Sequence, residues 1–172
     1  MGQTGSNMKP ALLVIDIQNV WLDENKDLRM SVEKRIEVIN EAIAWFRRNK
    51  RPIVAIYHED KDVASLPGTK PFEFPKTIRI NETDIKITKR YPSAFGKTEL
   101  EAVLRKKGCD TLVIAWLSAS GCVLATYFGA MDCDFRPYLV QGGVASHSEE
   151  HVRFAEEICE TLNVHAIDQL LR

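Results

Sequence analysis

Several features that mark specialised classes of protein are scarce in this sequence. Its 172 residues include only 9 glycines, 7 prolines and 4 cysteines, and the formal net charge is −1. So little glycine and proline excludes a collagen-like or low-complexity chain. A net charge near zero provides no field to recruit nucleic acid or an anionic membrane, and no apolar run approaches the roughly 20 residues that cross a bilayer. We therefore expect neither nucleic acid nor a membrane as a partner.

The cysteines are spread along the chain, at Cys109, Cys122, Cys133 and Cys159. These spacings match neither a zinc knuckle nor a disulfide framework, which favours a reducing compartment. Residues 1–7 are small and polar and lack the apolar core of a secretory signal, so we interpret them as a disordered leader or an expression remnant. The expected location is the cytoplasm.

The remaining composition is typical of a globular protein, with 45% apolar and 27% charged residues. A chain of this length buries one sizeable core, so we expect a single domain over residues 8–172. Short apolar runs alternate with segments of helical spacing, and the runs lack the alternation of half-exposed strands. This pattern predicts a three-layer α/β sandwich around a mainly parallel sheet of about six strands.

The apolar runs predict strands at residues 11–15, 53–57, 85–88, 112–116, 138–140 and 165–167. Helices are expected from Ser31 as N-cap to residue 51, from a capping box at Thr98, over residues 122–131, and from Ser148. Residues 58–84 form a long irregular connection, which is either a pocket wall or a solvated excursion. In such sheets, ligands bind beyond the carboxyl ends of the strands.

Three reactive side chains lie at the predicted carboxyl ends of strands: Asp16 and Lys89 come directly after the first and third strands, and Cys122 follows the fourth after the junction at residues 118–121. If the first and fourth strands flank the point where the strand order reverses, Asp16 and Cys122 face one crevice. Cys122 also begins a predicted helix, whose N-terminal amides favour a thiolate, as a Lys89 cation would. Asp16 could accept the thiol proton. The alternative for any single cysteine is a small buried hydrophobe.

Polar and aromatic neighbours add to this candidate site. Gln18 could orient a neighbouring group by hydrogen bonding, and Trp21 could wall an apolar pocket. Tyr91, Phe95 and Trp116 could extend that wall, with ordinary core packing as the alternative. We predict that these residues bind substrate.

Three segments together resemble the isochorismatase-like cysteine hydrolases, namely residues 13–19, 88–95 and 122–126. Their order and spacing agree with the family over about residues 10–167. The resemblance implies a three-layer α/β fold that acts on a small-molecule substrate, commonly as a homo-oligomer (a dimer or tetramer).

The resemblance also assigns roles to particular residues. It implies a catalytic triad of Asp16, Lys89 and Cys122, the three groups selected above. It implies a cis peptide between Leu117 and Ser118, and an oxyanion hole formed by the backbone N–H groups of Ser118 and Cys122.

The sequence departs from the family pattern at three places. Trp116 stands where the family commonly has glycine, Gly129 lies near a usual aspartate, and Gly142-Gly143 replaces a usual Asp-Ala pair. Because the usual glycine suggests that a backbone comes close there, we predict that the Trp116 indole faces the crevice and narrows the pocket. The alternative is that Trp116 packs in the core.

Nicotinamidases within this superfamily hold a metal with an aspartate and two histidines from the segment after the second strand. Here that segment offers only His58, since the next histidine is His147. We therefore predict no metal and no cofactor, with His58 lining the pocket or lying at the surface. His147 and His151 are four residues apart, but His147 falls at or before a helix cap, so a zinc site is not expected there.

These observations predict a metal-independent hydrolase that cleaves a C–N amide bond of a small molecule through a thioester on Cys122. An activated Cys122 thiolate would be alkylated rapidly below roughly pH 8. One alternative is a vinyl-ether hydrolase of the isochorismatase type, in which the cysteine is dispensable. The other is a non-catalytic binding scaffold with a partly filled pocket.

Overall fold

The computed structural model describes residues 8–171, except the side chain of Glu24, so the predicted leader at residues 1–7 lies outside the described part. Within that part, six strands form one all-parallel sheet in the order β3-β2-β1-β4-β5-β6. The strands are β1 (Pro10–Ile15), β2 (Ile53–His58), β3 (Ile85–Lys89), β4 (Thr111–Leu117), β5 (Arg136–Ala145) and β6 (Thr161–Leu162). The predicted α/β class with a parallel sheet is confirmed.

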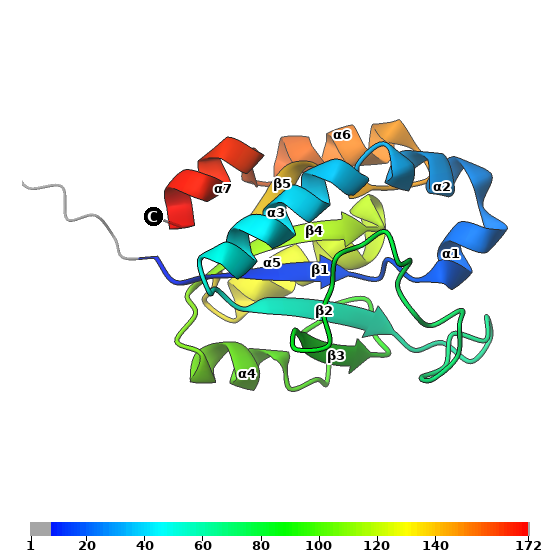
Figure 1. Cartoon of the computed structure of the whole chain (residues 1–172), viewed down its shortest axis with the longest axis horizontal. Helices are drawn as coiled ribbons and strands as arrows, with labels where there is room; N and C mark the ends of the chain where they lie inside the picture. The colour runs from blue at the N-terminus through cyan, green and yellow to red at the C-terminus, as the bar shows by residue number, and fades with distance from the viewer. Residues whose placement is uncertain (1–7, 172) are drawn as a thin grey trace, which may run out of the picture.

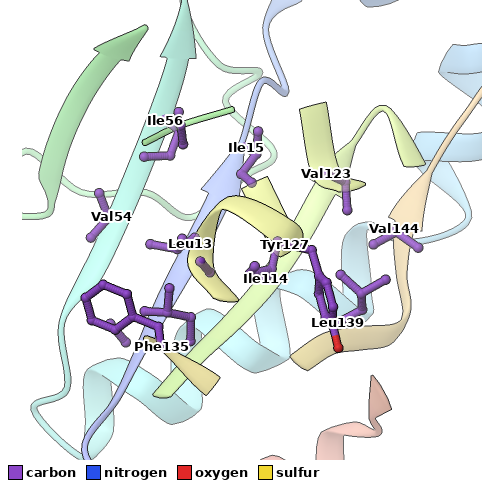
Figure 2. Packing of buried hydrophobic residues seen from close by; sticks show 14 of the residues in the cluster. Leu13, Ile15, Val54, Ile56, Ile114, Val123, Tyr127, Phe135, Leu139 and Val144 are labelled. Carbon is purple, nitrogen blue, oxygen red and sulfur yellow. The ribbon is translucent and has the colours of Figure 1, made fainter. Parts of the chain in front are cut away.

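Helices cover both faces of the sheet, which explains why the strands are apolar on both sides. The helices are α1 (Asn19–Glu24), α2 (Lys26–Glu33), α3 (Ile36–Arg48), α4 (Leu100–Lys106), α5 (Leu124–Asp132), α6 (Glu149–Ile158) and α7 (Val164–Leu171). One core joins the sheet to α4, α5 and α6, and the other joins it to α2, α3 and α7. Figure 1 shows α3 and α5 on opposite faces. Figure 2 shows Tyr127 of α5 packed against the strands that carry Ile114 and Leu139.

The strand order reverses between β1 and β4, and this reversal positions the candidate site. Ile15, the last residue of β1, pairs with Ile56 of β2 on one side and with Trp116 of β4 on the other. The arrowheads of β1, β2, β3 and β4 point to the same edge in Figure 1. Side chains that follow these strands therefore emerge together, as the rule for open parallel sheets requires.

The helix expected to begin at Ser31 is divided into two helices. Ser31 lies inside α2, and α3 begins only at Ile36. The Ser31 hydroxyl accepts a hydrogen bond from the Arg35 guanidinium (2.9 Å), which also donates to the Ser31 carbonyl (2.8 Å). Ser31 therefore stabilises the junction between the two helices instead of capping one long helix.

The strand expected at residues 165–167 is wrong, because these residues belong to α7. Asn163 caps that helix by accepting a hydrogen bond from the Ala166 N–H (2.9 Å). Ile167 and Leu171, four residues apart, turn into the core on one helical face. The last strand, β6, lies just before this helix cap and consists of Thr161 and Leu162.

The glycine pair that departs from the family pattern has a local structural cause. The pairing of β4 with β5 shifts register after Ile114, so that β5 contains extra residues. Gly142 has a φ of 69°, in the left-handed region that favours glycine. At Gly143, an added Cβ would lie 2.6 Å from Val140 Cγ1, which leaves room only for hydrogen.

No helix in the described residues is long and apolar enough to cross a membrane.

Candidate active site

Asp16 is the first residue after β1, and its backbone is strained. Its φ of 56° lies in the left-handed region, which a non-glycine residue adopts at a cost of about 1–3 kcal/mol. The Asp16 N–H donates to the Ile56 carbonyl (2.9 Å), and the Asp16 carbonyl accepts from the Gln18 N–H (2.9 Å). These bonds hold the turn that brings the carboxylate to the crevice.

The Lys89 ammonium connects the three predicted triad residues. Its Nζ lies 2.7 Å from Asp16 Oδ2 and 3.2 Å from Cys122 Sγ. The lysine side chain is fully buried, and the carboxylate is nearly so. The structure thus brings together three residues that are far apart in the sequence, at the edge predicted for the chemistry.

The charges of this group set the protonation of the sulfur. Burial raises the pKa of Cys122 to about 12, and the Asp16 charge adds to this rise while Lys89 opposes it. Burial also raises the pKa of Asp16 above its usual value, against the opposing effect of the Lys89 charge. Burial and the Asp16 charge thus favour a protonated sulfur, in opposition to the thiolate that helix position and Lys89 favour, and the rate at which Cys122 is alkylated stays a prediction.

Cys122 belongs to a wide turn, residues 119–123, that precedes α5. The helix expected from Cys122 begins instead at Leu124, because Gly121 adopts a non-helical conformation with φ −124° and ψ −109°. The Leu117–Ser118 peptide is cis, as the resemblance implies. The N–H groups of Ser118 and Cys122 remain the predicted oxyanion donors.

A cavity of about 310 Å³ opens over these groups, and Asp16 and Cys122 both line it. Its other lining residues are Trp21, Asn25, Leu28, His58, Asp60, Leu117, Ser118 and His147. A larger hollow, about 640 Å³, lies at the opposite edge beside Thr111 and Arg136, where β4 and β5 begin. The smaller cavity is the candidate site, because only it contains the reactive cluster.

Two of the predicted pocket residues, Trp21 and His58, line the cavity. A third, Gln18, does not line it but holds the backbone of His58. Gln18 is fully buried, accepts a hydrogen bond from the His58 N–H (2.7 Å) and donates to the His58 carbonyl (3.0 Å). Tyr91 does not line the cavity; it is 44% exposed and its hydroxyl accepts from Lys97 Nζ (3.0 Å). Phe95 packs against Phe135 on the α5 side of the sheet.

The prediction that Trp116 faces the crevice is wrong. The indole is fully buried in the core on the α3 side and does not line the cavity. The wall that this part of the chain provides consists instead of Leu117 and Ser118, the next two residues. The register shift between β4 and β5 lies beside Trp116, and apolar strand residues give no signal of such a shift.

Sequence reasoning missed several cavity residues. His147, considered only as a metal ligand, follows the end of β5 and lines the cavity; the same strand-end rule that selected Asp16 would have found it. Its ring packs edge to face against His151 at 4.9 Å, and His151 Nδ1 lies 3.2 Å from Ser120 Oγ. Asn25, at the α1–α2 junction, carried no sequence signal.

One group of side chains has the donor chemistry of a metal site. Asp16, His58 and Cys122 each offer a ligand atom, and these atoms lie within 4.8 Å of one another. Zinc accepts oxygen, nitrogen and sulfur ligands of these kinds. Lys89 Nζ, however, already lies 2.7–3.2 Å from all three groups. The positive charge of the lysine ammonium therefore opposes a second cation beside these three groups.

The family model of the Isochorismatase domain matches residues 10–169. The chain belongs to the isochorismatase family. It is 27% identical over 160 residues to the Bacillus subtilis isochorismatase family protein YddQ, covering 86% of this chain and 89% of that one. An isochorismatase-like hydrolase from Alkaliphilus metalliredigens shares the fold, with a TM-score of 0.87, 24% identity and coverage of 98% and 99%. N-carbamoylsarcosine amidase from Thermoplasma acidophilum superposes with a TM-score of 0.79 at 25% identity, over 91% of this chain and 97% of the amidase.

Proposed function

We propose that this isochorismatase-family hydrolase is a metal-independent cysteine amidase that cleaves a C–N bond of a small molecule. The observation that carries the proposal is the buried Lys89 ammonium, which contacts both the Asp16 carboxylate and the Cys122 sulfur, two groups that line one cavity. The similarity to an amidase supports C–N cleavage within the family. The cavity volume, about 310 Å³, fits a small substrate.

In the first half of the reaction, Cys122 attacks the amide carbonyl carbon while its proton passes to Asp16. A neutral resting thiol makes this transfer concerted with attack, because a free thiolate is scarce when the pKa is near 12. The carbonyl oxygen gains the negative charge and is bound by the Ser118 and Cys122 N–H groups. Asp16 then donates its proton to the leaving nitrogen, the C–N bond breaks, and the thioester remains.

In the second half, water attacks the thioester carbonyl and gives one proton to Asp16. The C–S bond breaks, the sulfur takes that proton back from Asp16, and the carboxylic acid product leaves. Lys89 holds the carboxylate in place through both halves, since its ammonium stays within hydrogen-bond distance of Asp16 Oδ2. Each residue ends the cycle in the state in which it began.

Exposed apolar side chains support the oligomer that the resemblance implies. Phe128 and Met131 of α5 and Phe154 and Ile158 of α6 are each 44–53% exposed. Both helices pack on the same core of the sheet, and large apolar side chains exposed on that side would be covered in a subunit interface. We include a homo-oligomer and a cytoplasmic location in the proposal.

A panel of small primary amides and ureas tests the proposal by measuring released ammonia. We expect turnover by the wild-type protein that persists after exhaustive chelation, and losses of at least 1,000-fold in Cys122→Ser and Asp16→Asn. Ammonia release retained in Cys122→Ser would overturn the thioester mechanism. Hydrolysis of a vinyl ether by the wild type and by Cys122→Ser alike, with no turnover of any amide, would favour the isochorismatase type of reaction. No turnover of any amide, together with unchanged ligand binding in Cys122→Ser, would favour a binding scaffold.

A further inference from the structure

The Lys89 ammonium has more acceptors around it than it has protons. Besides Asp16 Oδ2 and Cys122 Sγ, Nζ lies 2.8 Å from His58 Nδ1 and 3.2 Å from the Tyr91 carbonyl. An ammonium group donates only three hydrogen bonds, so four neighbours compete for three protons. The contact to His58 is shorter than those to Tyr91 and Cys122.

The short contact determines the state of the imidazole. Lys89 donates and cannot accept, so His58 Nδ1 must be unprotonated and the ring proton lies on Nε2. Burial lowers the pKa of His58, and the Lys89 charge lowers it further, whereas the charges of Asp16 and Asp60 oppose this change. A neutral imidazole with a proton on Nε2 satisfies the geometry.

The surrounding residues hold His58 in this position. Gln18 hydrogen-bonds to both the N–H and the carbonyl of His58, and Ser65 Oγ donates to the same carbonyl (2.9 Å). Gln18 Nε2 also donates to Ser65 Oγ (2.9 Å), and both of these side chains are fully buried. The Trp21 ring packs edge-on against the imidazole, with centroids 6.2 Å apart. Gln18 and Ser65 therefore fix the backbone of His58, and the Trp21 ring and Lys89 Nζ contact the imidazole itself.

We propose that His58 is a positioning residue, whose Nδ1 takes one proton of the Lys89 ammonium and thereby limits the hydrogen bonding of Lys89 to the Cys122 sulfur. The inference rests on the proposed function of Asp16, Lys89 and Cys122. Without His58 Nδ1, the three protons of the Lys89 ammonium would have three acceptors, Asp16 Oδ2, the Tyr91 carbonyl and Cys122 Sγ. The sulfur would then receive a full hydrogen bond. Thiolate character would then rise, and the thiol proton would be drawn less strongly to Asp16.

Three substitutions at one position separate this role from packing. In His58→Asn, Oδ1 takes the place of Nδ1; in His58→Gln, the carboxamide lies near the position of Nε2; and His58→Phe keeps a ring without an acceptor. We expect iodoacetamide to alkylate Cys122 at pH 7.5 about threefold or more faster in His58→Phe than in wild type, which corresponds to roughly one unit of thiol pKa. His58→Asn should match wild type, and His58→Gln should resemble His58→Phe.

Two outcomes would overturn the proposal: an alkylation profile in His58→Phe that equals wild type between pH 6 and 9, or equal profiles in His58→Phe and His58→Asn. Alkylation requires no turnover, so this result is independent of whether the amidase proposal holds. A second measurement covers variants that fail to fold. Long-range ¹H–¹⁵N spectra of the wild-type protein should show His58 with its proton on Nε2, and a proton on Nδ1 would contradict the inference.

Discussion

Replacing Asp16 by asparagine should change catalysis and thiol reactivity in opposite directions. Asp16→Asn keeps the size of the side chain and the acceptor toward Lys89, but it removes the base and the negative charge. Turnover should fall because no group accepts the Cys122 proton. Alkylation of Cys122 should become faster, because the Asp16 charge is a cause of its raised pKa and the Lys89 cation remains.

The distance between the two groups sets the size of the effect. Ligand atoms of Asp16 and Cys122 lie within 4.8 Å of each other. At an effective dielectric constant of about 20, a unit charge at that distance contributes roughly 3 kcal/mol, or about two units of thiol pKa. Thiolate abundance would rise about 100-fold, and the lower nucleophilicity of a less basic thiolate reduces the gain to about 10-fold in rate. Burial persists in the variant and keeps the pKa above that of a free thiol.

The assay is iodoacetamide labelling at pH 7.5, with the Cys122 peptide quantified by mass spectrometry. Cys122→Ser gives the background from the other cysteines. Asp60→Asn is the matched control, because Asp60 also lines the cavity but is not among the causes of the raised Cys122 pKa. Labelling of Asp16→Asn that is equal to or slower than wild type would refute the electrostatic reasoning.

Three further predictions follow from the same structure. Burial raises the pKa of Asp16, so kcat/KM should fall on the acid side at a pH above the ordinary carboxyl range. Below that pH Asp16 is protonated and cannot accept the Cys122 proton. A fall in kcat/KM at the usual aspartate pKa would contradict this prediction. Trp116→Gly should cost about 3–5 kcal/mol in denaturant unfolding and leave the ranking of amide substrates unchanged, because the indole fills the core. The wild-type chain should sediment as a dimer or larger, and Phe154→Glu should shift it toward monomer; a wild-type monomer at micromolar concentration would contradict the oligomer.

The features that the sequence predicted best are those with a direct physical signature. Apolar runs without alternation require burial on both faces, and this requirement identified β1, β2 and β4 correctly. The strand-end rule then selected Asp16, Lys89 and Cys122 because parallel strands place their carboxyl ends at one edge. These inferences depend on local pattern and on a general topological rule, and neither requires knowledge of exact packing.

The features that the sequence did not predict depend on packing and on neighbouring charge. The indole of Trp116 packs in the core beside a register shift between β4 and β5, and apolar residues report neither feature. The raised pKa of Cys122 follows from burial and from the Asp16 charge, whereas the sequence indicated only the helix position and the Lys89 cation, which favour a thiolate. The contact of His58 with Lys89 depends on Gln18 and Ser65, which meet only in the folded chain.

Direct detection of the acyl-enzyme tests the central claim. The wild-type protein is mixed with the best amide substrate, quenched in acid within one turnover, and analysed by intact and peptide mass. The account predicts a covalent adduct on the Cys122 peptide with the mass of the substrate less the leaving amine, lost on treatment with hydroxylamine and absent in Cys122→Ser. Turnover without any adduct on Cys122, or with an equal rate in Cys122→Ser, would contradict the account.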